Sequence, residues 1–432
     1  MPLMLFGKAI FYTAVVWGLV ADSPAMAKHV QSIVAQNNSE PSQFPSNNTS
    51  NGVTRSNPLL TEEVSDPLLP SLPIERELSP LEKRSLRQEL DRLNARAQSQ
   101  LQAGKVDEAF RIWLRELRLR RFLGVPGEIQ ALARVGNIAW RRDRFQEVRW
   151  ITQRLEQLET EAAITASENF PLASRLAVAY QQLRSRNAID IYKQILDVAT
   201  AENNVATQAR TLNTLGQLHL DYLEYSQAAV TYEELLALLT DSLSNQSGNP
   251  TAANGSPLTR QQTLVKLVYA YRQANKLDLA IQRREELIQQ YRQNQNLTEI
   301  PQLQIETAQD YRTLGKTNAA IRTLQDAFRL AWSSQYFSMA ADALQELATL
   351  YRRQERSTEA LQVYRILLEV HRRSRNTYGL MQSYDAIAQL HLQQKAYNNA
   401  LEAFQKGLEQ ARILGDRESY FIQKIEKIRQ EI

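Results

Sequence analysis

The sequence of 432 residues contains no cysteine, and this absence excludes several kinds of site. Disulfide bonds, thiolate metal centres and cysteine nucleophiles are all ruled out. Histidine is scarce as well, with four residues in the whole chain, and no two of them lie four residues apart. No arrangement of serine, histidine and aspartate indicates a catalytic triad. The composition therefore favours a protein that is not an enzyme.

The N-terminal hydrophobic run is too short to span a membrane on its own. Ala9–Ala21 is apolar over 13 residues and follows the single basic residue Lys8, whereas a spanning helix needs about 20. Asp22-Ser23-Pro24 then breaks the helix, and Ala25-Met26-Ala27 has the small-x-small pattern of a cleavage site. Residues 1–27 are therefore predicted to be a signal peptide that exports the chain across the cytoplasmic membrane, into the periplasm or an equivalent lumen. An uncleaved membrane anchor is the alternative.

Residues 28–78 are rich in asparagine, serine, glutamine and proline and show no helical or strand periodicity. Such a composition buries too little apolar surface to offset the chain entropy, which predicts a disordered tether. Ser79 can then cap a helix that begins at Pro80, and Glu82 completes a capping box. The folded part is therefore expected to span residues 79–432.

A small residue followed four positions later by a larger one, mostly apolar or aromatic, recurs along the folded part. Successive small residues are separated by 39, 40, 40, 52, 40, 40 and 40 positions, a period that is typical of a helical solenoid. The longest interval contains a predicted inserted loop at residues 241–260, rich in glycine, asparagine, serine and proline. Each unit is expected to hold two amphipathic helices that cross at small residues. The pairs are Ala109/Trp113, Val148/Thr152, Ala188/Tyr192, Ala228/Tyr232, Ala280/Arg284, Ala320/Leu324, Ala360/Tyr364 and Ala400/Phe404.

Two units carry a recognisable signature. In the fourth unit it consists of Leu212, Leu215, Gly216, His219, Ala228, Tyr232 and Leu235, and in the eighth of Tyr384, Ile387, Ala388, His391, Ala400 and Phe404. These residues resemble the tetratricopeptide repeat (TPR) family, in a 40-residue variety rather than the standard of about 34. The resemblance implies an all-α, right-handed α-solenoid of about eight TPR-like helix pairs. The segment after the last pair, Arg417–Ile432, has Phe421, Ile425, Ile428 and Ile432 on one face and is predicted to be a C-terminal capping helix.

One segment looks like the end of a phosphate-binding loop, namely Gly315-Lys316-Thr317. That motif requires a preceding strand and a glycine five residues earlier, where this chain has Asp310. His219 and His391 occupy a repeat position that holds tyrosine in other units, so they are interpreted as core residues. No catalytic residue, metal ligand or cofactor is therefore predicted.

The first helix of each TPR unit lines the concave face, so the resemblance implies that certain positions of that helix face a partner. Amide side chains pair with both N–H and C=O groups, which suits an extended peptide backbone. The predicted binding residues at these positions are Asn94, Asn137, Arg141, Asn213, Gln217, Arg272, Gln309, Arg312, Arg352 and Gln389.

Three of these residues, Arg272, Arg312 and Arg352, recur at a spacing of 40, each directly after a tyrosine. Stacked repeats would line up the three guanidinium groups, and each can hold a carboxylate through two hydrogen bonds. One hypothesis is that this ladder binds an acidic or C-terminal segment of a partner protein. The structural alternative is that each arginine pairs with a carboxylate of the next repeat or faces solvent.

Basic charge is concentrated in residues 80–160, which carry 17 basic and 11 acidic side chains, a surplus of six. The surplus lies mainly in Arg115–Arg121 and Arg141–Arg144. Such a patch could meet nucleic acid, anionic lipid or an acidic protein. A solvated face is the favoured interpretation, because an exported protein rarely meets nucleic acid.

The favoured function is an exported scaffold, an assembly factor or adaptor that binds a protein or an extended peptide, possibly acidic, in its concave groove. The alternative is a periplasmic metal-delivery or photosystem-assembly helper that binds a divalent cation through acidic residues of neighbouring repeats. Nucleic acid is not expected as a partner. Membrane contact is expected only through an uncleaved signal anchor or through a client.

Overall fold

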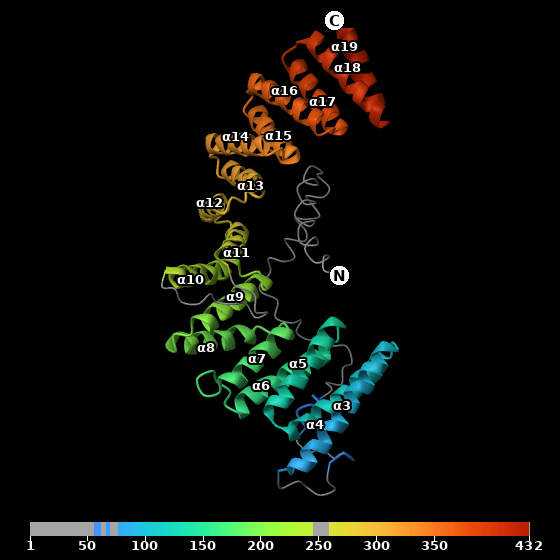
Figure 1. Cartoon of the computed structure of the whole chain (residues 1–432). Helices are drawn as coiled ribbons and strands as arrows, with labels where there is room; N and C mark the ends of the chain where they lie inside the picture. Colours follow the sequence, from blue (N-terminus) through green and yellow to red (C-terminus); the bar gives the residue numbers. More distant parts are fainter. Residues whose placement is uncertain (1–55, 62–65, 70–76, 245–258, 432) are drawn as a thin grey trace. The chain divides into compact units, whose positions relative to one another are not determined.

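The computed structural model describes residues 56–61, 66–69, 77–244 and 259–431. The predicted signal peptide, most of the predicted tether and residues 245–258 of the predicted inserted loop lie outside these ranges. Every regular element within them is helical (Figure 1). No helix in these ranges combines the length and the apolar character needed to cross a membrane.

The described helices form eight consecutive pairs followed by one terminal helix, as the repeat predicts. The first helices are α3 (Pro80–Gln102), α5 (Val125–Arg141), α7 (Phe170–Gln182), α9 (Val205–Asp221), α11 (Arg260–Gln273), α13 (Ile300–Thr313), α15 (Phe337–Arg353) and α17 (Thr377–Gln393). The second helices are α4 (Val106–Arg120), α6 (Phe145–Glu161), α8 (Asn187–Ala201), α10 (Tyr225–Ser244), α12 (Leu277–Gln293), α14 (Thr317–Ser333), α16 (Ser357–Arg373) and α18 (Tyr397–Leu414). A short 3-10 helix, η1 (Arg121–Leu123), joins α4 to α5, and α19 (Glu418–Glu431) ends the chain. The all-α solenoid prediction is confirmed.

The recurring small residue lies on the second helix of each pair and is buried in all eight pairs. A second small position, on the first helix of the fourth pair, shows how closely the two helices approach. A Cβ added at Gly216 of α9 would lie 2.6 Å from the ring of Tyr232 on α10. Because the two helices approach so closely, a larger side chain there would force the core apart.

The turns between paired helices also repeat. In the last four pairs a residue in the left-handed region ends the first helix: Asn275, Gly315, Glu355 and Lys395, with φ of 55, 71, 58 and 56°. Gly315 therefore belongs to a structural series with a spacing of 40 residues. The segment Gly315-Lys316-Thr317 is the turn between α13 and α14, and it follows a helix rather than a strand.

Both ends of the helical array are closed as the sequence predicts. Ser79 accepts a hydrogen bond from the backbone N–H of Glu82 and donates its own N–H to the Glu82 carboxylate, which completes the capping box. At the other end, α19 buries Phe421, Ile425 and Ile428. The ring of Phe421 packs edge-on against Phe404 of α18, with centroids 6.2 Å apart.

The structure differs from the predicted tether over residues 28–78 in its last part. Pro58–Thr61 and Asp66–Leu69 pack against the first helix pair instead of standing free of it. Leu59 is 2% exposed and belongs to the same buried cluster as Phe110 and Trp113 of α4. The compositional argument failed here because one leucine and one aspartate are enough to fix a short segment when the folded surface offers matching partners.

Candidate functional site

Most of the predicted binding residues are engaged inside the protein. Asn94 accepts hydrogen bonds from Trp113 and Arg134, Lys266 donates to Asn213, and Gln389 donates to Tyr420 of α19. Gln217 donates to Asp221 on its own helix. Apart from Gln217, these side chains connect different helices, a role that the prediction of a peptide-binding surface did not foresee.

The arginine ladder follows the structural alternative at two of its three members. Arg272 lies with Nε 3.2 Å from Oδ1 of Asp310 in the next repeat. Arg312 donates from Nη1 to Glu346 of the next repeat over 2.8 Å, and Gln309 donates to the other oxygen of that carboxylate. Among the described residues, the one hydrogen-bond partner of the Arg352 side chain is the hydroxyl of Tyr364, at 3.5 Å. Two of the three guanidinium groups are therefore already paired with a carboxylate.

Of the two remaining predicted residues, Asn137 lines a cleft and Arg141 does not. Both lie on α5, and Asn137 lines a hollow of about 700 Å³ between α5 and α7. The lining from α5 is Ile129, Gln130, Ala133, Arg134, Asn137 and Ile138, and from α7 Ser174, Arg175, Val178 and Gln182. The cleft is therefore a hollow lined by two neighbouring first helices.

A long connection places α7 beside this cleft. Eight residues, 162–169, separate α6 from α7, whereas three residues separate α8 from α9 and α14 from α15. Ile164 and Ala166 of the long connection are buried. Besides its pair partner α8, α7 therefore packs against α5 and only slightly against α6, and the two first helices α5 and α7 form the walls of the cleft (Figure 1).

The chemistry of the cleft is amide-rich, apolar and basic. The side chains of Gln130, Asn137, Arg175 and Gln182 have no hydrogen bond or ion pair to any other described residue, and Val178 is 43% exposed. The charged lining residues are both arginines. An extended segment can therefore receive backbone hydrogen bonds from the amides, bury a small apolar side chain and meet a positive charge.

Sequence reasoning found Asn137 but missed the α7 side of the cleft. Val178, Arg175 and Gln182 fall outside the positions expected to face a partner, because the third unit keeps the repeat pattern only loosely. The long connection between α6 and α7, which is rich in serine, threonine and alanine, was the available signal.

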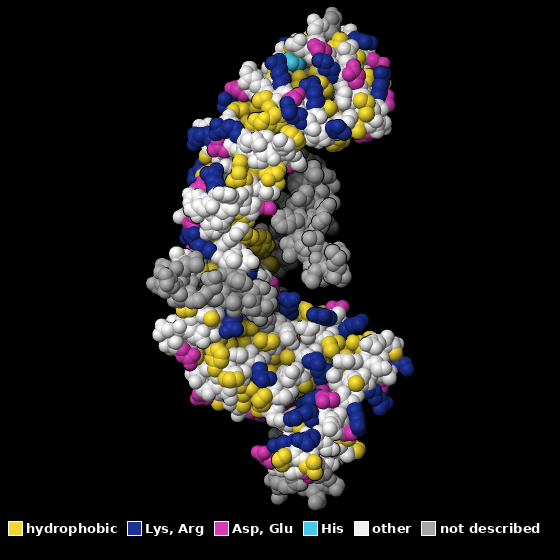
Figure 2. All heavy atoms as spheres, viewed as in Figure 1, with side chains coloured by type: hydrophobic (Ala, Val, Ile, Leu, Met, Phe, Trp, Pro, Cys, Tyr) yellow, Lys and Arg dark blue, Asp and Glu magenta, His cyan; other side chains and the backbone are white. Residues whose placement is uncertain are grey.

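Three arginines of the basic early repeats form ion pairs within the chain. Arg115 pairs with Asp66, Arg120 with Asp91 and Glu116, and Arg144 with Asp107 and Glu147. On the face seen in Figure 2, basic side chains are interspersed with acidic and apolar ones.

Two histidines of the helices, His219 and His371, are buried within the fold. His219 is buried, with Nδ1 2.7 Å from Oε2 of Glu224, and burial is the largest cause that lowers its pKa. His371 is buried against Gly379, and burial lowers its pKa too. Within the described ranges, no three histidine, aspartate or glutamate side chains cluster in a way that could hold a metal ion.

The type of fold follows from the helix pairs. In each pair a small residue is buried where the two helices pack together, and most of these residues are 40 positions apart. The fold is of the TPR type. A family model for soluble NSF attachment protein matches residues 263–411 of this TPR array, about a third of the chain. No curated protein matches the sequence.

Several solved helical-repeat structures are similar to this TPR protein. Aspartyl phosphate phosphatase F from Bacillus subtilis has 15% identity and a TM-score of 0.36, with 71% of this chain and 78% of that chain covered. The C-terminal part of a TPR repeat-containing protein from Cytophaga hutchinsonii has 15% identity and a TM-score of 0.35, covering 64% and 94%. The protein MamA has 17% identity and a TM-score of 0.31, covering 46% and 96%. Identities at this level describe a likeness of fold and transfer no function.

Proposed function

We propose that this TPR protein is an exported scaffold that holds an extended, acidic segment of a partner protein in the cleft between α5 and α7. The observation that carries the proposal is the set of cleft side chains without a partner in the described chain: Gln130, Asn137, Arg175 and Gln182. Elsewhere on the first helices the polar side chains that were expected to bind are mostly used between repeats.

The proposed partner follows from the lining. No carboxylate lines the cleft, and of its two arginines Arg134 is already paired with Glu116 whereas Arg175 has no ion pair to a described residue, which favours an acidic segment over a basic one. Three amides offer donors and acceptors to a backbone, and Ile138 and Val178 offer apolar contact. Export is proposed from the N-terminal pattern alone, that is, from Lys8, the apolar run Ala9–Ala21 and the small residues Ala25 and Ala27.

Site-directed photo-crosslinking tests the proposal. A photoreactive amino acid at Val178 should crosslink the same partner segment in the exported fraction and with purified protein, and mass spectrometry should map it to an extended acidic stretch. Arg175→Glu should reduce the crosslink at least ten-fold, because a like charge then faces the acidic segment. The matched control is Arg353→Glu, an equal charge change at an exposed arginine of α15.

Loss of the crosslink in both arginine variants would show a general charge effect and would contradict the cleft. Crosslinking to a helical or basic segment would contradict the proposed partner chemistry. Export is tested separately by fractionation: retention of the full chain inside the cytoplasmic membrane would contradict it.

A further inference from the structure

A short N-terminal strap, defined as Pro58–Thr61 and Asp66–Leu69, lies on the first helix pair. Its most buried residue is Leu59, which enters the cluster formed by Phe110, Trp113 and Leu117 of α4. A few residues later, Leu68 and Leu69 pack against a separate cluster that contains Leu90 and Leu119. The strap is therefore anchored by apolar side chains at both ends.

Two arginines donate hydrogen bonds to the strap between these two apolar contacts. Arg121 of η1 donates from Nη1 to the carbonyl of Thr61 and from Nη2 to the carbonyl of Leu59, both over 2.9 Å. Arg115 of α4 donates from Nε and Nη2 to the two oxygens of Asp66, over 2.7 and 2.8 Å. The second pair has the bidentate geometry that favours recognition of carboxylates.

The charge of Asp66 is held by this surface. Its side chain is 9% exposed, and the hydrogen bond from Arg115 is the largest cause that lowers the pKa of the carboxyl below its usual range. Burial lowers the pKa of Arg121, whose carbonyl partners are neutral. A carboxylate in this place is therefore favoured over a neutral side chain.

These contacts are the means by which proteins recognise extended peptides in trans: an apolar socket, donors to backbone carbonyls and a fork for one carboxylate. The strap itself has turns but no helix or strand over its described residues. Each polar contact from the helices reaches either a main-chain carbonyl or the one aspartate. The surface therefore recognises a sequence pattern in an extended segment and does not require a folded partner.

We propose that the surface of α4 and η1 is a second peptide-docking site, occupied in cis by the strap, and that it accepts a partner segment with a leucine seven residues before an aspartate. The spacing is that of Leu59 and Asp66. This inference is independent of the cleft between α5 and α7, because different side chains carry it.

The cis arrangement sets the strength that a competitor needs. A segment tethered by a short length of chain has an effective concentration of the order of millimolar, and about ten residues separate the strap from α3. A free peptide with the strap sequence should therefore displace it only near that concentration. A partner with a better fit would displace it at lower concentration.

The first test uses the full chain with its strap contacts intact. Because the chain has no cysteine, Leu60→Cys provides a unique site for a spin label on an exposed residue of the strap. Adding a synthetic peptide with the sequence of residues 56–69 should convert the label from an immobile to a mobile signal, with a midpoint of the order of millimolar. A peptide with lysine in place of the aspartate at position 66 should leave the signal unchanged. Equal displacement by both peptides, or displacement by neither, would overturn the proposal.

The second test measures direct binding by fluorescence anisotropy of the labelled peptide. Full-length protein with Leu59→Ala and Asp66→Lys has a weakened strap and should bind the peptide at least ten-fold more tightly than the wild type. Adding Arg115→Glu should abolish that gain, whereas Arg111→Glu, on the same helix and paired with Glu108, should preserve it. Far-ultraviolet circular dichroism checks that the variants are folded. Equal affinity of wild type and weakened-strap protein would show that the strap does not occupy the site.

Discussion

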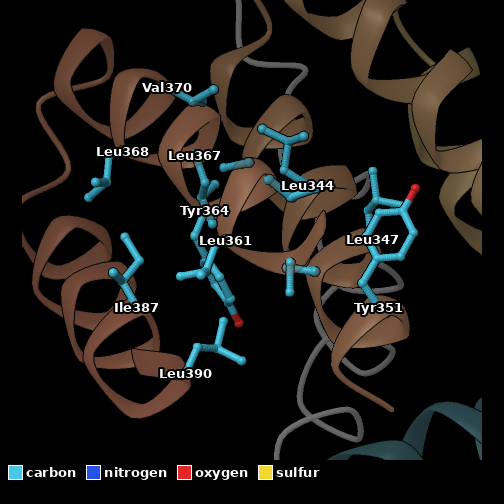
Figure 3. Packing of buried hydrophobic residues seen from close by; sticks show 14 of the residues in the cluster. Leu344, Leu347, Tyr351, Leu361, Tyr364, Leu367, Leu368, Val370, Ile387 and Leu390 are labelled. Atoms are coloured by element: carbon cyan, nitrogen blue, oxygen red, sulfur yellow. The ribbon is translucent and has the colours of Figure 1, made fainter. Parts of the chain in front are cut away.

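Two junctions between neighbouring repeats are filled by different kinds of side chain. At the junction of α16 with α17, Tyr364 occupies the position four residues after the small Ala360, and Figure 3 shows it with Leu361 between side chains of α15 and of α17. At the junction of α12 with α13, the equivalent residue is Arg284, which is fully buried and donates over 2.8 Å to the buried Asp310. One junction is apolar and the other contains a charged pair.

The charged junction also divides the buried apolar residues. One cluster ends with Leu287 of α12, and the next begins with Ile305 of α13. Nε and Nη2 of Arg284 have no hydrogen-bond partner within the described residues. Burying a charged pair costs about as much desolvation free energy as the attraction returns, so such a pair contributes little net stability but is costly to break. The apolar junction should therefore accept other side chains of similar size, whereas the charged junction requires both members of its pair.

Breaking the charged pair should have the largest effect. Asp310→Leu leaves the Arg284 guanidinium buried without its carboxylate and should lower the free energy of unfolding by about 3–5 kcal/mol, measured by urea titration. Asp326→Ala, at a half-exposed aspartate of α14, is the control and should cost less than about 0.5 kcal/mol. Similar losses for the two variants would show that the buried pair carries no special cost.

Truncating the apolar junction should have the second largest effect. Leu367 of α16 is fully buried, and Leu367→Ala should cost about 3 kcal/mol through lost transfer free energy and a residual cavity. The neighbouring Ile366 is 43% exposed, so Ile366→Ala should cost much less in the same titration. Equal costs would mean that the apolar junction is as adaptable as a surface.

Replacing the charged pair as a whole should cost little. The double variant Arg284→Leu/Asp310→Leu removes both buried charges and should unfold within about 1 kcal/mol of the wild type, or at higher urea concentration. This result would show that the charged junction can be replaced by an apolar one. A loss as large as that of Asp310→Leu alone would show that the pair contributes net stability.

The smallest expected effect is a pH dependence of the stability of the α16–α17 junction. His371 of α16 packs against Gly379 of α17, and burial lowers its pKa below the ordinary value of about 6.5. The unfolded chain therefore binds a proton first, so stability is full above pH 6.5 and declines as pH falls toward the folded pKa. Hydrogen exchange at pH 7 and pH 5 should show faster opening at α16–α17, and His371→Gln should remove that difference. Faster opening in the variant as well would assign the effect to another group.

The fold was predictable because it depends on a repeated local constraint. The buried small residues, the capping box at Ser79 and the apolar face of α19 all follow from spacing and side-chain size. The predicted tether was wrong at its end, because docking of Leu59 and Asp66 depends on a surface that forms only after α4 has folded.

The candidate site was predictable only in part. Asn137 was found by its position, but the fate of Arg272 and Gln309 depends on where Asp310 and Glu346 lie in the next repeat. Such pairs are set by packing between helices and not by position within one repeat. The α7 wall of the cleft depends on an eight-residue connection whose path no periodicity describes.

Connectivity in this molecule is mainly between neighbours: helices pack against the next helix in the chain or the next but one. The described part of the chain should therefore respond to tension as a series of links, because each helix is held mainly by its neighbours in the chain. When the two ends of the helical array are pulled apart, the links should give way one after another at different forces. The junction at Arg284 and Asp310 lies between two separate buried apolar clusters, so it is one of the links at which the array should come apart.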